Sequence, residues 1–169
     1  MTSPPSRRVT QIAPGLWRWT CPPSPCAHGE ISSVYCETPS AIVLVDPVLP
    51  SVGSAEHQRF LRALDADVAR LGLPVAVLTT SEAHARDAAA LASRYETPFT
   101  GGTLPVGVVV LEVRPPASAA ERAFWLPSHR ALIVGHAQEE SARAELARNG
   151  AGTLLERLLS IHELAPTGP

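Results

Sequence analysis

Short apolar stretches bounded by Pro, Gly, Ser or Asp predict β-strands along most of the chain. The predicted strands cover residues 9–13, 16–20, 31–38, 41–46, 74–80, 106–113, 122–127 and 131–136. Pro14-Gly15 is a strong turn signal and separates the first two strands. The stretch 41–46 (AIVLVD) is almost wholly apolar, so we expect it to be buried on both faces of a sheet.

Two segments have the periodicity of amphipathic helices. In residues 54–71 the large apolar side chains fall on one helical stripe, and Gly72 supplies a stop. The stripe consists of Phe60, Leu64, Val68 and Leu71. Residues 81–95 predict a second helix, with Ser81 as its N-cap.

The tail from about residue 139 is rich in Ala and Leu and is predicted to be helical, with a break at Asn149-Gly150. The order of the elements is strands, then a strand and helix in alternation, then strands, then helices. This order predicts a layered α/β sandwich whose strand-end loops carry any chemistry. We expect a single domain over residues 9–165, preceded by a disordered N-terminal tail over residues 1–8.

Composition excludes several classes of function. The chain of 169 residues has a formal net charge of −2, which gives no electrostatic reason to expect nucleic acid. All fourteen basic side chains are arginine, and the absence of lysine excludes Schiff-base chemistry and the Gly-Lys-Thr phosphate loop. No Gly-x-Ser-x-Gly elbow occurs either. The N-terminus lacks the apolar core of a signal peptide and no window approaches a membrane span, so we expect a cytoplasmic protein.

Three cysteines, Cys21, Cys26 and Cys36, occur with His28 between them. The spacing Cys-x4-Cys-x-His does not match the tight spacings of structural zinc sites, and thiols stay reduced in the cytoplasm. We therefore interpret the cysteines as ordinary thiols and assign them no role.

Polar side chains gather where the predicted strand 74–80 gives way to the second helix. The candidate site residues are Thr80, Glu82, His84 and Asp87 at this junction, with Asp46 and His136 at the ends of two other predicted strands. A well-capped helix also explains the junction, because Glu82 and Asp87 would interact with its dipole, each by about 0.3–1 kcal/mol. Glu121 and Arg122 either point into the same cleft or form a surface ion pair, which we favour.

Four segments resemble the metallo-β-lactamase superfamily in their order and spacing. They are VTQIAPGLWRWT, AIVLVDP, LPVAVLTT and FWLPSHRALIVGHA, within residues 9–137. The resemblance implies an αββα sandwich with a site along one sheet edge, where Asp46 supports the site without binding metal itself. An aspartate before proline at a strand end is also a good turn former, and we favour this interpretation of Asp46. The tail is shorter than the second half of this fold usually is, so we expect the sandwich to be truncated in its C-terminal half.

The zinc ligands that this resemblance implies are missing from the sequence. Zinc-binding members carry Thr-His-x-His-x-Asp-His at the strand-to-helix turn, where imidazoles and a carboxylate converge on the metal. Counted from Thr79, the four ligand positions hold Thr80, Glu82, His84 and Ala85. The later family positions differ as well: residues 112–122 contain no histidine, His136 replaces the aspartate after Gly135, and Pro166-Thr167-Gly168 replaces the closing Pro-x-His-Gly.

Two hypotheses of function follow from these substitutions. In the first, which we favour, the chain is a degenerate member without the binuclear zinc site, a pseudo-enzyme that binds a small molecule or a partner and needs no cofactor. In the second, it is a metal-dependent hydrolase of a small ester, thioester or lactam. Its remodelled mononuclear site would hold one zinc or iron ion with His84, His136, Glu82 and Asp46.

The interaction partners follow from the same composition and fold. A shortened sandwich would leave apolar surface uncovered, which predicts a homodimer or a complex with an unidentified chain. We expect neither nucleic acid nor a membrane as a partner.

Overall fold

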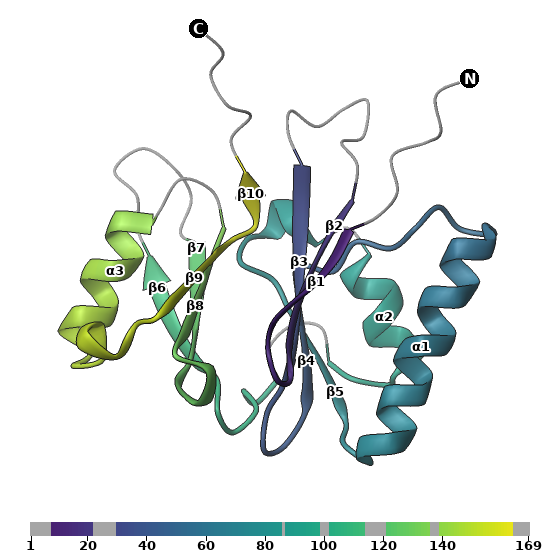
Figure 1. Ribbon diagram of the computed structural model, residues 1–169, viewed down its shortest axis with the longest axis horizontal. Coiled ribbons are helices and arrows are strands. Elements are labelled where there is room, and N and C mark those ends of the chain that lie inside the picture. The colour runs from purple at the N-terminus through teal and green to yellow at the C-terminus, as the bar shows by residue number, and fades with distance from the viewer. Residues whose placement is uncertain are drawn as a thin grey trace, which may run out of the picture.

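The computed structural model describes residues 8–21, 30–85, 87–98, 102–113, 121–135 and 139–163. In these ranges the chain forms two β-sheets with helices on their outer faces (Figure 1). The first strand already begins at Arg8. The rest of the predicted N-terminal tail lies outside the described residues.

The first sheet is formed by the N-terminal half of the chain and one short C-terminal strand. Its successive strands are β1 (Arg8–Ala13), β2 (Leu16–Cys21), β3 (Glu30–Glu37), β4 (Ile42–Val45) and β5 (Val75–Leu78). Neighbours are antiparallel except for the parallel pair β4–β5, and β10 (His162–Glu163) pairs with β3. Because β4 and β5 are parallel, their C-terminal ends meet at the same edge of the sheet.

The second sheet comes from the C-terminal half. Its strands are β6 (Val109–Val113), β7 (Glu121–Leu126), β8 (Ala131–Val134) and β9 (Arg157–Ser160), in this order. The short 3₁₀ helix η2 (Pro127–His129) joins β7 to β8, and η3 (Gly152–Leu154) precedes β9. Helix α3 (Glu139–Arg148) buries Ala142 and Leu146 against the outer face of this sheet.

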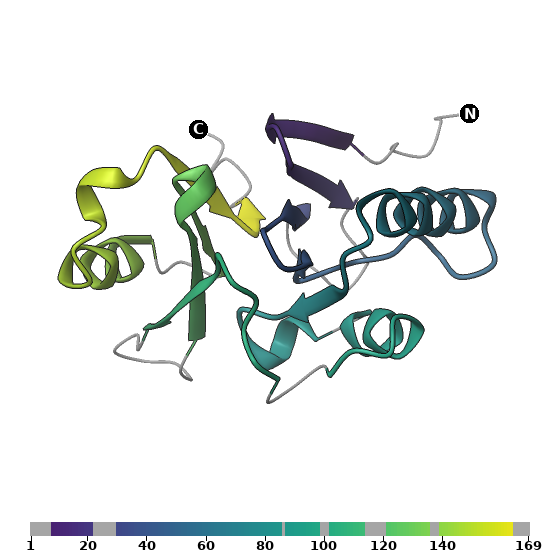
Figure 2. The same cartoon turned by 90° about the horizontal axis from the view of Figure 1, so that it is seen from below.

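The two sheets pack face to face between helical layers. Figure 2 shows α1 (Ala55–Leu71) and α2 (Ala88–Arg94) on one side of the first sheet and the second sheet on its other side. Buried residues between the sheets come from both halves of the chain, among them Val34, Val43, Val45, Phe124, Leu126 and Ile133. This four-layer arrangement confirms the predicted αββα sandwich.

Strand β4 lies at the centre of the molecule, as its apolar sequence predicted. Val43 and Val45 belong to the core between the sheets, whereas Ile42 and Leu44 pack toward the helices. All four side chains are fully buried. Each contributes about 1.5–3 kcal/mol of hydrophobic stabilisation, which explains why a strand with two buried faces needs an unbroken apolar sequence.

Helix α1 has the limits that its sequence predicted. The Ser54 side chain accepts a hydrogen bond from the His57 N–H at 3.0 Å, which caps the helix start. Gly72 ends the helix in the left-handed conformation, with φ of 65°, and donates its N–H to the Val68 carbonyl at 2.9 Å.

Two predictions about elements are wrong. Residues 81–95 form no continuous helix: a 3₁₀ turn, η1 (Glu82–His84), is followed by the separate α2. The tail is α-helical only in α3, and its residues 157–163 instead contain β9 and β10. There, parallel pairing with β8 outweighs the helical propensity of Leu, Glu and Arg.

The second half of the sandwich is the smaller one. It contributes four strands and the single longer helix α3 within the described ranges, against five main strands and two helices in the first half. This asymmetry agrees with the expected reduction of the C-terminal half. None of the described helices is long and apolar enough to cross a membrane.

Candidate functional site

The candidate site begins at the sheet edge where β4 and β5 both end. Asp46 directly follows β4, and Thr80 lies two residues after β5. The Thr80 N–H donates to Asp46 Oδ1 at 2.8 Å, and the Thr80 hydroxyl donates to Asp46 Oδ2 at 2.5 Å. Both residues are almost fully buried, at 0% exposure for Thr80 and 1% for Asp46. Thr80 thus contacts both oxygens of the carboxylate.

His84 completes this cluster from the turn η1. Its Nδ1 lies 2.7 Å from Thr80 Oγ1 and 3.2 Å from Asp46 Oδ2, and the residue is 2% exposed. A threonine hydroxyl has a single hydrogen, and here it is given to Asp46. Nδ1 must therefore carry a proton and donate toward Thr80 and Asp46. We call Asp46, Thr80 and His84 the edge cluster.

The loop after β4 is fixed from behind by Ser33 on β3. The Ser33 hydroxyl donates to the Asp46 carbonyl at 2.8 Å and accepts from the Val48 N–H at 3.1 Å. Asp46 has φ of 46°, a left-handed backbone conformation that non-glycine residues adopt infrequently. The hydrogen bonds of Ser33 and Thr80 hold it there, so the orientation of the carboxylate is built into the fold.

Glu121, the first residue of β7, reaches the edge cluster from the second sheet. Its Oε2 is buried and has no hydrogen-bond partner among the described residues. Burial raises the pKa of this carboxyl, the charge of Asp46 raises it further, and His84 opposes the shift. An added Cβ at Gly135 would lie 3.2 Å from Glu121 Oε2 and 2.8 Å from Thr80 Oγ1, so both groups lie close to Gly135.

The favoured surface ion pair of Glu121 and Arg122 is therefore wrong. Arg122 donates its N–H to the Thr80 carbonyl at 2.8 Å, and its guanidinium reaches Thr79 Oγ1 at 3.3 Å. Glu121 instead turns its carboxylate inward. Adjacent side chains of a strand point to opposite faces of the sheet. This alternation is the sequence signal that could have predicted different surroundings for Glu121 and Arg122.

Glu82 and Asp87, two further predicted site residues, are not part of the edge cluster. The structure exposes Glu82 to solvent. The Asp87 carboxylate accepts the Leu49 N–H at 2.7 Å and so anchors the loop before α1. His136 lies outside the described residues. Of the four ligands in the mononuclear hypothesis, the described structure thus brings together only Asp46 and His84.

The predicted helix cap at this junction is also wrong. Ser81 makes no capping hydrogen bond through its side chain, and its buried Oγ has no partner among the described residues. Asp87 is the N-cap residue of α2 but makes no capping hydrogen bond through its side chain, and Glu82 lies in the preceding turn η1. The dipole of a continuous helix therefore does not explain the acidic residues here.

Cys36, the cysteine whose side chain the structure describes, does not contribute to this edge. Cys36 on β3 is fully buried in the core, and burial raises the pKa of its thiol to about 12, so it stays protonated. Cys21 closes β2. Cys26 and His28 lie outside the described residues.

The chemistry of the edge cluster does not match a zinc centre. A zinc site needs three or four protein ligands with free lone pairs. Thr80 is not a usual zinc ligand and His84 Nδ1 carries a proton, so the edge cluster offers at most an Asp46 oxygen and His84 Nε2, fewer ligands than a zinc site needs. Within the described ranges, no three His, Cys, Asp or Glu side chains could hold a metal ion together. These residues do not fit the metal that the fold implies.

Thr80 is equally unsuited to be a nucleophile. Its hydroxyl contacts both an imidazole and a carboxylate, which resembles part of a catalytic triad. In a triad, however, the base accepts the hydroxyl proton, whereas Nδ1 of His84 donates. The hydroxyl is also fully buried. The arrangement is a closed structural network.

Comparison with known proteins identifies the fold. No protein-family model and no curated protein matches the chain. Among solved structures, it is similar to the DIM-1 metallo-β-lactamase, with a TM-score of 0.56 and 13% identity over 94% of this chain and 90% of that one. It is also similar to an NDM/FIM-1-like metallo-β-lactamase from Erythrobacter litoralis in its mono-zinc form, with a TM-score of 0.58 and 15% identity over 94% and 89%.

A third similar structure is the FIM-1 metallo-β-lactamase from Pseudomonas aeruginosa in its mono-zinc form, with a TM-score of 0.52 and 12% identity over 93% of this chain and 88% of that one. At such identities the likeness defines the architecture alone. The chain has the metallo-β-lactamase fold. The His-x-His-x-Asp-His motif is missing from its sequence: no two of the six histidines are separated by a single residue.

Proposed function

We propose that this chain is a non-catalytic protein of the metallo-β-lactamase fold, which binds a small molecule or a partner and does not hydrolyse a substrate at a binuclear zinc centre. One observation carries the proposal. At the sheet edge expected to hold the site, Asp46, Thr80 and His84 satisfy one another's hydrogen bonds in a nearly solvent-free cluster. A hydrolytic site of this type needs open ligand positions and access for water.

Metal content tests this proposal most directly. The chain would be purified without a polyhistidine tag, incubated with excess Zn²⁺ or Fe²⁺, exchanged into metal-free buffer and measured by elemental analysis. We expect far less than one metal ion per chain. A zinc-loaded metallo-β-lactamase carried through the same steps is the control for losses. Close to one tightly held ion per chain would contradict the proposal.

A second function, metal-dependent hydrolysis at a mononuclear site, is favoured by one specific arrangement. A carboxylate beside one ring nitrogen of a histidine is a common support for metal binding through the other nitrogen. Asp46 lies 3.2 Å from His84 Nδ1 in this way, and Glu121 Oε2, which has no hydrogen-bond partner among the described residues, lies near the cluster. On this alternative, His84 would bind through Nε2, with Glu121 and His136 as further candidate ligands.

Paired variants decide between the two functions. If the mononuclear site exists, combining His84→Ala with His136→Ala removes the bound ion, whereas His57→Ala on α1 leaves it in place. If the chain is non-catalytic, all three proteins show the same low metal content. Hydrolysis of chromogenic ester, thioester and lactam substrates, measured on the same samples, would show whether any retained ion supports catalysis.

A further inference from the structure

A pocket lies on the outer face of the first sheet, between the sheet and α1. Its volume is about 370 Å³, within the range of small-molecule sites. Its walls include the aromatic residues Trp17, Trp19, Tyr35 and Phe60, with Asp67 and Arg70 as the charged lining residues. None of the edge-cluster residues lines it. This aromatic pocket is therefore separate from the edge where the fold usually has its site.

Two pairs of packed aromatic rings form the wall of the pocket. Trp17 and Tyr35 pack edge to face, with ring centroids 5.6 Å apart and planes at 81°. Trp19 packs against Phe60 at 5.5 Å, and its indole N–H donates to the Val48 carbonyl at 2.9 Å. Besides Phe60, α1 contributes Ala63 and Leu64 to the apolar lining. The aromatic wall is thus held in place without filling the pocket.

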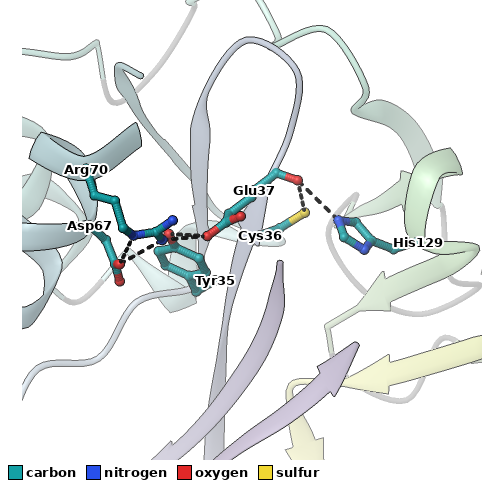
Figure 3. Close-up of polar contacts among 6 residues, drawn as sticks. All are labelled: Tyr35, Cys36, Glu37, Asp67, Arg70 and His129. Carbon is teal, nitrogen blue, oxygen red and sulfur yellow. Dashed lines mark hydrogen bonds and ion pairs between the residues drawn. The ribbon is translucent and has the colours of Figure 1, made fainter. Parts of the chain in front are cut away.

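The charged end of the pocket carries an excess of negative charge. Arg70 donates to Glu37 Oε1 at 3.1 Å and to Asp67 Oδ1 at 2.9 Å, so one guanidinium faces two carboxylates (Figure 3). The Tyr35 hydroxyl also donates to Glu37 Oε1, at 3.3 Å. Burial, followed by the charges of Asp67 and Glu37, raises the pKa of Tyr35, and Arg70 only partly opposes this. The potential here favours a cation.

We propose that the aromatic pocket binds a small organic cation with an apolar body, of the quaternary ammonium or alkylated amine class. Aromatic walls attract such cations through the negative faces of their rings, and the two carboxylates supply the matching charge. An organic anion would have to displace Arg70 from both carboxylates. A neutral molecule would gain the apolar contact but not the charge attraction. This inference rests on the proposed binding function and specifies its ligand and place.

Binding of three compounds with the same aromatic ring tests the charge preference. The probes are benzyltrimethylammonium, neutral benzyl alcohol and anionic phenylmethanesulfonate, each titrated into the full chain by calorimetry and followed by tryptophan fluorescence. We expect the cation to bind about tenfold more tightly than the other two. Equal affinities, or tighter binding of the sulfonate, would overturn the inference.

Two alanines on the exposed side of α1 provide a matched pair of variants. Ala63 lines the pocket, whereas Ala66 lies on the same helix outside it. We expect Ala63→Phe to abolish binding of benzyltrimethylammonium and Ala66→Phe to leave it unchanged. Unchanged binding in Ala63→Phe would overturn the inference. A homodimer of the free chain that only Ala63→Phe dissociates would also overturn it, by assigning the pocket to a second copy.

A charge variant tests the polar end. Asp67→Asn is expected to weaken binding of benzyltrimethylammonium several-fold and to leave the affinity for benzyl alcohol unchanged. The reason is that Asp67 contributes charge to the pocket and not apolar surface. An unchanged cation affinity would contradict the assigned role of this carboxylate. Cation binding and metal content test separate proposals. A chain that binds both the cation and one zinc ion would contradict the proposed non-catalytic function but would support the assignment of the aromatic pocket.

Discussion

Asp46 links the end of β4 to β3 and to the segment after β5. Its side chain holds Thr80 beyond β5, and its carbonyl accepts from Ser33 on β3. Its left-handed backbone costs about 1–3 kcal/mol, which these hydrogen bonds offset. A turn-forming aspartate before proline would be exposed and replaceable, whereas this one is buried at the centre of a network.

Removing the Thr80 hydroxyl tests how strongly the edge cluster depends on it. Thr80→Val keeps the shape but leaves the buried Asp46 Oδ2 and His84 Nδ1 without this partner. We expect a loss of about 1–3 kcal/mol in the free energy of unfolding, measured by urea denaturation. Thr80→Ser keeps the hydroxyl, so its free energy of unfolding should fall clearly less than that of Thr80→Val. Equal losses in the two variants would mean that the methyl group, not the hydrogen bond, supports the cluster.

Glu121 gives the stability of the protein a specific pH dependence. Its pKa is raised in the folded state, so the folded chain holds the proton more tightly than the unfolded chain. Its favourable contribution is present below the unfolded pKa and is lost as pH rises through the folded pKa. At pH values above the folded pKa of Glu121, the Glu121→Gln variant should therefore have a larger free energy of unfolding than the natural chain. Glu82→Gln, at an exposed position, is the control. The same change in the pH dependence of stability in both variants would contradict the assignment of this dependence to Glu121.

The site could be located from the sequence but its nature could not. Parallel strands end at one sheet edge, so the common edge of Asp46 and Thr80 followed from the predicted β4 and β5. The sequence does not encode the direction in which the Thr80 hydroxyl and the His84 ring turn. The inward carboxylate of Glu121 depends on the packing of the second sheet against the first, which brings together residues far apart in the chain.

At the scale of elements, prediction succeeded where local signals were complete. Helix α1 has a capping serine, an apolar stripe and a terminal glycine. Residues 81–95 lack an equivalent cap because the Asp87 carboxylate accepts no N–H of the helix start and instead accepts the Leu49 N–H. The sequence of β9 has helical propensity, and only its pairing with β8 makes it a strand. Such pairing is non-local and leaves no local sequence signal.

The strand assignment of the tail makes a quantitative prediction. Ile161, between β9 and β10, is fully buried in the core between the sheets, whereas Leu154 in η3 is 49% exposed. We expect Ile161→Ala to reduce the free energy of unfolding by about 2–5 kcal/mol. Leu154→Ala should change it little, by about 0.5 kcal/mol or less. Similar, small effects in both variants would mean that the C-terminal segment does not pack between the sheets.

At the scale of the whole molecule, the two halves share one core. Val43 and Val45 of the first sheet pack in the same cluster as Phe124 and Ile133 of the second. Neither sheet can lose this interface without exposing the apolar face of the other. The natural unit of stability is therefore the complete sandwich and not each half.

A shared core predicts a single unfolding transition. Replacing Trp17 and Trp19 by phenylalanine leaves Trp125, in the second sheet, as the sole tryptophan. Its fluorescence should then report the same midpoint in urea as far-ultraviolet circular dichroism of the whole chain. Calorimetry of the natural chain should show one peak. Two separated midpoints would mean that the halves unfold independently.

The contact of Gly135 with Thr80 also constrains how this scaffold could acquire catalysis by laboratory evolution. Any side chain placed at position 135 would collide with the Thr80 hydroxyl, 2.8 Å from the site of its Cβ. A new donor at that position is accessible only after position 80 has changed, and changing position 80 first dismantles the network around Asp46. The order of mutations is thereby restricted, and single-step libraries at position 135 should yield no folded, active clones.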